Sequence, residues 1–534
     1  MTADISNNKR ATYLSICAAG LVPALAALLV VVWRPWWLGF YHDDWWMIAR
    51  GADPSFFTDF TEQASRPLYF LLITTLKQVL PATPLPWQIL LAGLVIGNAF
   101  LIGLVGRRFA FVMQANPDTA WWAGCLGAAV WLCCPWALGA TAWVTPAVGH
   151  VAIGFFCLAA LFLLSERAIG QKLVWSGVFL TLAYLINELF WFAFVPLLFA
   201  PAARDLLRHG YSALRPLVLL LTGLLAVQAL PIALNRGVAF FGVGINRSLN
   251  AQGIDLAIMS ARLVPTEISR AVIFPEVFWG LTGSLALAAV AALAVVTRYG
   301  RWRGVVIVLA GLMAIVAGCI GSLILFALAG YRLESIGLFS RSFITFSVWI
   351  SWLPAVLLAL SESLPHWPRR AIIAGCLAVV ALLGGSTVVR LSDWRAAWED
   401  QQAIIAALPI DQLKTNSSPG SFIVVLLPER TSPVEGIEAF WDMTGVLISR
   451  APDLVERLRD PDQRMFATAA RLSKHRVSWD GSNMTMSWCA PQSGDLWSLK
   501  AKTDLLVWDA AHRRLSMFDR SVTFGCGIDP PSAL

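Results

Sequence analysis

Long apolar segments recur along most of this chain, and many are about as long as a helix must be to cross a bilayer. Such a helix needs about 20 consecutive apolar residues. Only 14% of the residues are charged, against roughly 25% in soluble domains. The sequence therefore predicts an α-helical polytopic membrane protein with about 11 transmembrane helices. We place them at 11–33, 87–106, 119–141, 147–164, 173–188, 189–203, 214–234, 271–296, 305–329, 343–364 and 371–389.

Basic residues indicate how these helices are oriented. Lys9 and Arg10 precede the first segment, and each loop that we place on the same side is also basic. Cytoplasmic loops carry the excess of Lys and Arg, so we expect the N-terminus in the cytoplasm and everything after residue 390 outside. A single long tilted helix over 173–203 is the alternative, and it would invert all that follows. The net charge of +7 suits a protein beside anionic membrane lipids and is no sign of nucleic-acid binding.

The last quarter of the chain is much more polar. We predict a transmembrane domain over 1–390 and a small soluble α/β domain over 391–534. Its only cysteines, Cys489 and Cys526, suit a disulfide in an oxidising compartment. The predicted elements are an amphipathic helix at 394–408, a buried strand at 421–427, a helix at 434–450 and a hairpin of 505–508 with 515–518.

An acidic pair, Asp43 and Asp44, follows the first predicted helix within the aromatic run Phe40–Trp46. An ionised carboxylate at a membrane surface is costly unless it meets a cation, a proton donor or water. We interpret the pair as the acid–base end of an active site, with His42 and Trp45 as substrate contacts. Aromatic residues also gather at membrane interfaces without any catalytic role, and an acidic pair can be a solvated turn.

Several arginines lie in loops that the predicted topology places outside, where Arg is normally scarce. Some reach lipid headgroups by snorkelling. The others need another reason, and the planar guanidinium is suited to binding phosphate through two parallel hydrogen bonds. We expect Arg332 and Arg341, which flank one short loop, to bind the phosphate of a lipid-linked substrate, with Glu334 between them. Arg66 and Arg247 are further substrate-binding candidates.

Four other polar residues are candidates for substrate binding. Asn187 and Glu188 stand at the outer end of a predicted span, where an ionisable residue is a functional candidate. A structural salt bridge to an external arginine is the alternative for Glu188. His150 begins another span, where an interfacial structural role is the commoner one. Glu62 lies in the same loop as the acidic pair.

Taken in order, these features resemble the GT-C superfamily of integral membrane glycosyltransferases, in its bacterial members that use polyprenyl-phosphate sugars. Asp43-Asp44-Trp45 is similar to the acidic loop signature of that family. Arg66–Phe70 resembles the start of its second juxtamembrane helix, and 394–408 with the strand at 421 resembles the onset of its periplasmic domain. The resemblance covers most of the chain as architecture, but only these short motifs as sequence.

The resemblance implies an inverting sugar transfer at the periplasmic face of the bacterial inner membrane. A loop aspartate, for which we favour Asp43, takes the proton of an acceptor hydroxyl. The hydroxyl attacks the anomeric carbon, polyprenyl phosphate leaves, and arginine holds the developing charge. Asp44 would orient Arg66 or the acceptor, which is a glycan or a lipid. No metal is expected to be required, although Glu62 and Glu188 could hold a divalent cation.

Two other functions fit the same features. A transporter or flippase of lipid-linked glycans needs polar residues near the middle of the bilayer, and the spans hold few, such as Asn98 and Gln228. A polymerase or ligase of surface glycans is typically marked by a large external loop with paired Arg and His. The segment 235–270 has the arginines but no His.

Overall fold

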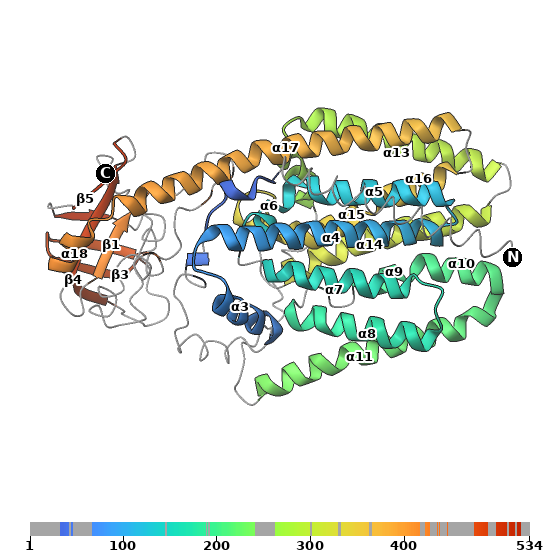
Figure 1. Cartoon of the computed structure of the whole chain (residues 1–534), viewed down its shortest axis with the longest axis horizontal. Coiled ribbons are helices and arrows are strands. Elements are labelled where there is room, and N and C mark those ends of the chain that lie inside the picture. Colours follow the sequence, from blue (N-terminus) through green and yellow to red (C-terminus); the bar gives the residue numbers. More distant parts are fainter. Residues whose placement is uncertain are drawn as a thin grey trace.

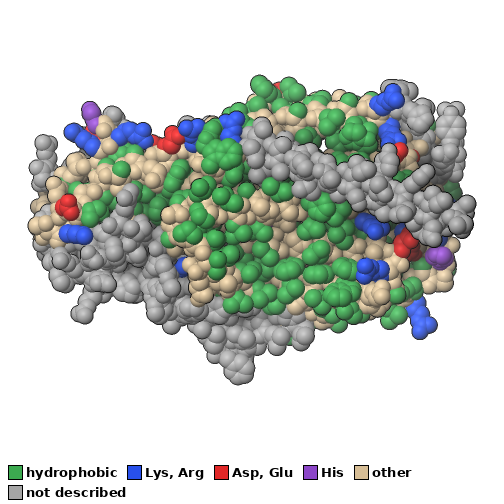
Figure 2. Space-filling model, in the orientation of Figure 1, with side chains coloured by type: hydrophobic (Ala, Val, Ile, Leu, Met, Phe, Trp, Pro, Cys, Tyr) green, Lys and Arg blue, Asp and Glu red, His purple; other side chains and the backbone are tan. Residues whose placement is uncertain are grey.

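The structure is a bundle of long helices joined by one of them, α17, to a strand-containing C-terminal region (Figure 1). Figure 2 shows hydrophobic side chains covering the flank of the bundle, with Lys and Arg gathered mainly toward its ends. The computed structural model describes residues 33–41, 44–45, 48, 67–144, 147–187, 190, 193–240, 262–298, 302–328, 333–362, 366–416, 422–427, 435, 437, 446, 475–489, 498–509, 512–517 and 521–524.

The described helices confirm a polytopic membrane protein. Seven of them are long and apolar enough to cross a bilayer, or up to eight if one bent pair, Pro117–Cys133 with Pro135–Thr141, counts as a single span. Leu68–Val79 and Ala147–Leu163 are shorter apolar helices. The first predicted span, 11–33, lies outside the described residues except for Trp33, so the total of about 11 stays a prediction.

Most helix boundaries lie close to the predicted ones. The helices are η1 (Pro35–Trp37), α3 (Pro67–Val79), α4 (Pro84–Val112), α5 (Pro117–Cys133), η3 (Pro135–Ala137), α6 (Leu138–Thr141), α7 (Ala147–Leu163), α8 (Ile169–Ile186), α9 (Phe194–Leu197), α10 (Phe199–His209), η5 (Gly210–Ala213), α11 (Leu214–Phe240), α13 (Pro275–Arg298), α14 (Trp302–Leu328), η6 (Leu338–Phe343), α15 (Ile344–Ile350), α16 (Leu353–Ser361), α17 (His366–Ala406) and α18 (Ile410–Asn416).

Helix α8 ends before Asn187, inside the region where one long helix was the alternative prediction. The backbone of Asn187 is extended, with φ −151° and ψ 114°, and ends α8. The segment 173–203 is therefore not one long helix. This agrees with the two separate spans that we predicted there, at 173–188 and 189–203.

Gly103 and Gly124 let α4 and α5 pack closely, because a Cβ at position 124 would lie 2.6 Å from the Gly103 carbonyl oxygen. Small residues commonly permit such close helix contacts in membranes.

The C-terminal region contains a six-stranded sheet with the order β1-β4-β3-β2-β6, and β5 pairs with β4. Among the strand pairs that the structure describes, β1 with β4 is the parallel one, with Val424 opposite Leu505. The predicted strand at 421–427 and the predicted hairpin are confirmed, because Asp509 pairs with Arg514 across the β4–β5 turn. The strands are β1 (Phe422–Leu426), β2 (His475–Trp479), β3 (Asn483–Trp488), β4 (Ser498–Asp509), β5 (Arg514–Met517) and β6 (Val522–Phe524).

Three features of this region differ from the predictions or are only partly described. The predicted amphipathic helix at 394–408 is not separate: α17 runs without a break from the last span across residue 390. Of the predicted helix at 434–450, only residues 435, 437 and 446 are described. Cys489 is disulfide-bonded, but its partner is not among the described residues, so the pairing with Cys526 stays a prediction.

Candidate functional site

Asp44 is fully buried at the end of the bundle from which α17 leaves. Its Oδ2 accepts hydrogen bonds from the backbone N–H of Tyr41, at 3.0 Å, and of Val144, at 3.3 Å. The first bond closes a tight turn of its own segment, and the second ties that segment to the chain after α6. Asp44 therefore joins two parts of the molecule that are far apart in sequence.

The described part of the acidic segment, residues 39–41 with 44 and 45, lies against the C-terminal half of α17. The Tyr41 hydroxyl donates to the Trp394 carbonyl oxygen at 2.8 Å, and its burial raises the pKa of Tyr41. The indole of Trp45 donates to Gln401 Oε1 at 3.1 Å and stacks on Trp398 with ring centroids 6.1 Å apart. Trp45 is only 6% exposed. Its contacts with Gln401 and Trp398 therefore give it a structural role, and its predicted role as a substrate contact stays a prediction.

Gln88, at the start of α4, is a site residue that our sequence reasoning missed. Its buried side-chain amide donates to two carbonyl oxygens, those of Gly39 at 2.8 Å and of Ala142 at 3.0 Å. Both carbonyls flank the contact between the acidic segment and the chain after α6. A polar residue among apolar ones at the start of a span was the only sequence signal for this role.

Arg341 lies beside the same contact. Its guanidinium carbon is 4.7 Å from the ring centroid of Trp143, the residue before Val144. Beneath it η6 packs on α6, where the Gly139 N–H donates to Ser340 Oγ at 2.6 Å. The structure thus brings Asp44, a predicted catalytic residue, and Arg341, a predicted phosphate ligand, into contact with the same short segment, at Val144 and Trp143 respectively.

A buried ion pair supports the loop before η6, the short helix that carries Arg341. Arg390 of α17 pairs with Glu435, and the two side chains are 3% and 0% exposed. Arg390 also donates to the carbonyl oxygens of Pro135 at 2.8 Å and of Ser335 at 2.6 Å. Glu435 Oε2 accepts from the Gly337 N–H at 2.7 Å. One charge pair therefore links the bundle, the loop before η6 and the C-terminal region.

His150 acts inside the bundle. Its Nε2 lies 2.9 Å from the Ala140 carbonyl oxygen, and its Nδ1 lies 3.2 Å from the side-chain nitrogen of Asn98. Because the carbonyl can only accept and the amide nitrogen can only donate, the ring carries its proton on Nε2 and is neutral. His150 is fully buried, so the structure gives it a positioning role toward α6. A direct contact with substrate stays a prediction.

Two further predicted residues are described, and they lie in different places. Asn187 ends α8 beside Gly149, where a Cβ would lie 3.8 Å from Asn187 Nδ2. Glu334 is partly buried in the loop before η6. Among the described residues no three His, Cys, Asp or Glu side chains form a group that could hold a metal ion. The predicted residues outside the described part are His42, Asp43, Glu62, Arg66, Glu188, Arg247 and Arg332.

The fold and the site together define a multi-pass helical membrane protein whose C-terminal region is joined to the bundle beside a buried acidic segment. No family model matches the chain, and no curated protein matches it. Its structure is similar to that of ArnT from Cupriavidus metallidurans in the apo state, with 14% identity, 86% of this chain and 91% of that chain covered, and a TM-score of 0.44. The structure of the same protein bound to undecaprenyl phosphate is similar with 12% identity, 98% and 99% coverage and a TM-score of 0.41.

Proposed function

We propose that the chain is a glycosyltransferase that moves a sugar from a polyprenyl-phosphate donor to a hydroxyl acceptor at the end of the bundle that holds Asp44. The observation that carries this proposal is the meeting of the acidic segment and Arg341 around residues 142–144. A carboxylate-bearing turn and a guanidinium in one place, at the outer ends of apolar helices, match what transfer from a lipid phosphate requires.

Each participant has a defined task in the proposed reaction. Asp43 accepts the proton of the acceptor hydroxyl, whose oxygen bonds to the anomeric carbon as the bond from that carbon to the phosphate oxygen breaks. Polyprenyl phosphate leaves with the electron pair of the broken bond. Stacking on Trp143 orients the guanidinium of Arg341, which holds the charge that develops on the phosphate. Asp44 holds Tyr41 by a hydrogen bond and so supports the part of the chain to which Asp43 belongs.

The proposal is tested first by lipid binding, because the sugar is unknown. Undecaprenyl phosphate is titrated into the purified full chain in detergent, with Arg341→Gln and, as a matched control, Arg476→Gln, which changes an exposed side chain of strand β2. We expect the control to bind as the wild type does and Arg341→Gln to bind at least about tenfold more weakly, because a charge-assisted contact to the phosphate is lost.

Transfer is then measured in membranes with a panel of radiolabelled undecaprenyl-phosphate pentoses and hexoses. We expect transfer by the wild type and none by Asp43→Asn, which retains lipid binding. Mass spectrometry of the product separates addition of one sugar from transfer of a preassembled glycan, as a polymerase or ligase would perform. Equal lipid binding by Arg341→Gln and wild type, together with full transfer by Asp43→Asn, would refute the proposal.

A further inference from the structure

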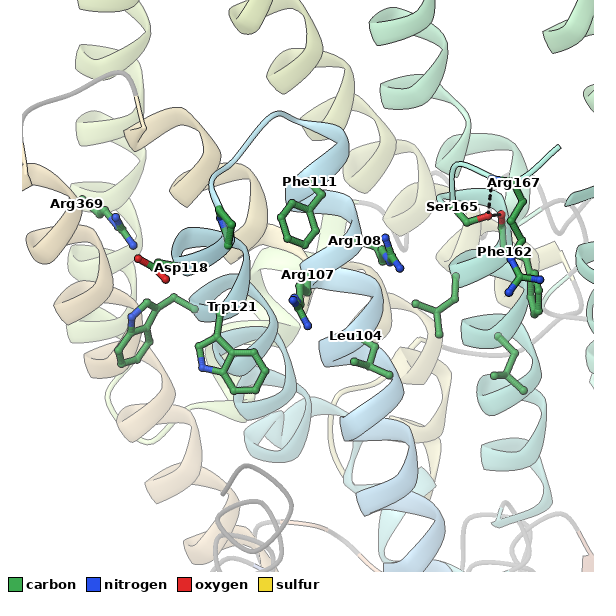
Figure 3. Close-up of a pocket in the computed structure, with 14 residues that line it drawn as sticks. Leu104, Arg107, Arg108, Phe111, Asp118, Trp121, Phe162, Ser165, Arg167 and Arg369 are labelled. Atoms are coloured by element: carbon green, nitrogen blue, oxygen red, sulfur yellow. Dashed lines mark hydrogen bonds between the residues drawn. The ribbon is translucent and has the colours of Figure 1, made fainter. Parts of the chain in front are cut away.

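A cavity of about 950 Å³ lies at the other end of the bundle (Figure 3). Helix α4 connects the two ends, because Gln88 contacts the acidic segment and Arg107 lines the cavity. A rise of about 1.5 Å per residue puts these two residues roughly 28 Å apart along α4. That separation is close to the thickness of the hydrocarbon core, about 30 Å, so the cavity faces the opposite membrane surface.

The charged residues that line the cavity are mostly basic. Arg107 and Arg108 come from α4, Arg167 from the turn after α7, and Arg369 from the start of α17. Among the described residues that line the cavity, Asp118 supplies the one carboxylate. Figure 3 shows the two α4 arginines between Asp118 on one side and Arg167 on the other. Four guanidiniums facing one carboxylate favour a ligand that carries negative charge.

Aromatic rings hold two of these arginines in place. The Arg107 guanidinium carbon lies 5.5 Å from the ring centroid of Phe111 and 5.9 Å from that of Trp121. The Arg167 guanidinium carbon lies 4.8 Å from the ring centroid of Phe162. Such stacking limits the freedom of the guanidinium before any ligand binds. Arginines that merely reach for the membrane surface need no common cavity and no such support.

The remaining walls are apolar. Leu104, Leu158 and Leu161 line the cavity from α4 and α7, and Trp122 of α5, which is exposed, lines it as well. Tryptophan is enriched at the level of lipid headgroups. An apolar wall beside a basic one suits a ligand with a charged head and a hydrocarbon tail. The volume is at the upper end of what pockets for small ligands offer, roughly 300–1,000 Å³.

We propose that this cavity binds the phosphate headgroup of an anionic lipid from the membrane leaflet opposite the candidate transfer site. The phosphate lies among the guanidiniums, and the start of the acyl chains follows the leucines. This proposal is independent of the proposed sugar transfer, because neither the residues nor the membrane face is shared. A soluble phosphate compound has the same charged group, but it would leave the apolar wall unused.

The test uses the full chain in nanodiscs of phosphatidylcholine that contain a small fraction of phosphatidylglycerol. Native mass spectrometry counts the lipids that remain bound. The variant is Arg108→Gln/Arg167→Gln, in which both residues are exposed and line the cavity. The matched control is Arg303→Gln/Arg370→Gln, which removes two exposed arginines outside the cavity. Arg303 is also stacked on a ring, that of Trp302, at 5.7 Å, so it matches Arg167.

We expect the wild type and the control to retain phosphatidylglycerol selectively, and the cavity variant to retain it at least about tenfold less well. Asp118→Asn removes the only opposing carboxylate among the residues that line the cavity, so we expect it to raise retention. The Asp118→Asn variant also tests the proposal if the double variant does not fold, because loss of structure cannot increase the retention of phosphatidylglycerol.

Four results would overturn the proposal. Equal losses in the cavity variant and the control would show a general attraction between basic loops and anionic lipid. Equal retention of phosphatidylcholine and phosphatidylglycerol would show that the headgroup is not selected. Displacement of the lipid by millimolar sn-glycerol 3-phosphate would identify a soluble phosphate compound as the ligand instead. An unchanged Asp118→Asn variant would also contradict it.

Discussion

At the scale of single residues, Asp44 shows how an acidic residue predicted to be catalytic can be part of the scaffold. The two hydrogen bonds that it accepts from described backbone N–H groups, those of Tyr41 and Val144, use one oxygen, Oδ2. An asparagine has one side-chain oxygen that can accept both bonds. The role of Asp44 can therefore be separated from that of its neighbour Asp43 by the choice of substitution.

We predict that Asp44→Asn retains most of the stability and transfer activity, whereas Asp44→Ala loses both. The alanine leaves two buried N–H groups without an acceptor, at about 1–3 kcal/mol each. Thermal unfolding in detergent and the transfer assay measure the two effects. A folded Asp44→Asn protein without activity would instead make Asp44 a catalytic residue.

His150 offers a second test at the same scale. We expect His150→Ala to lower the free energy of unfolding by about 1–3 kcal/mol, because the Ala140 carbonyl loses its donor and Asn98 loses an acceptor. The affinity for undecaprenyl phosphate should change little in the protein that remains folded. A large loss of affinity at unchanged thermal stability would show that His150 contacts the lipid-linked substrate directly.

At the scale of secondary-structure elements, the contact between α6 and η6 sets the position of Arg341. Gly139 permits it, because a Cβ there would lie 2.6 Å from the Leu338 carbonyl oxygen and 2.7 Å from that of Gly337. Real Cβ atoms do not come so close to backbone oxygens, so a larger residue must push η6 away. The close packing of α6 on η6 therefore requires a residue without a Cβ at position 139.

We predict that Gly139→Ala destabilises the protein by about 1–3 kcal/mol, as overpacking of a tight contact does, and weakens binding of undecaprenyl phosphate by moving Arg341. Gly280→Ala is the control, because a Cβ at that helical position meets nothing within 4 Å. Thermal unfolding and lipid titration of both variants check this. Wild-type values for Gly139→Ala would mean that Arg341 does not depend on this contact.

The length of α17 is another property of an element. Its sequence changes from apolar to amphipathic near residue 390, and we therefore predicted a span and a separate helix. No glycine or proline stands between Gly385 and Pro409 to interrupt the helix, and the structure shows one continuous helix. A change in polarity marks where a helix leaves the membrane, whereas its end depends on residues that break or cap it.

At the scale of the whole molecule, the buried pair of Arg390 and Glu435 connects the bundle to the C-terminal region. A buried pair adds little net stability compared with apolar residues, but loss of one partner leaves an uncompensated charge. Because Glu435 also accepts from Gly337, the C-terminal region supports the loop that leads to Arg341. The two parts of the chain therefore act as one structure at the candidate site.

We predict that Glu435→Ala lowers the free energy of unfolding by about 3–5 kcal/mol. The double variant Arg390→Met/Glu435→Leu should recover a large part of that loss, because it removes both charges and keeps the volume filled. Thermal unfolding measures stability, and limited proteolysis reports release of the C-terminal region. If the double variant were as unstable as Glu435→Ala, the hydrogen bonds to Pro135, Ser335 and Gly337 would carry the contact instead.

Much of the fold could be predicted from the sequence, because it depends on local properties. Apolar length set most of the described spans, short apolar runs set β1 and the strands of the β4–β5 hairpin, and a polar turn between two such runs set the hairpin itself. The candidate site was predicted only in part. Asp44 and Arg341 do contact neighbouring residues of one segment, Val144 and Trp143, but nothing in the sequence indicated that Gln88 and Glu435 support this region. A single polar residue in an apolar segment does not reveal its partner.

The sequence by itself determined that this chain is a helical membrane protein with a polar C-terminal region, because helix formation and membrane insertion follow from local runs of residues. Only the tertiary structure decided which polar side chains serve as scaffold. Asp44, Trp45 and His150 have their hydrogen-bonding partners on distant elements, and a buried polar group is defined by such partners. Those contacts exist only after the helices have packed.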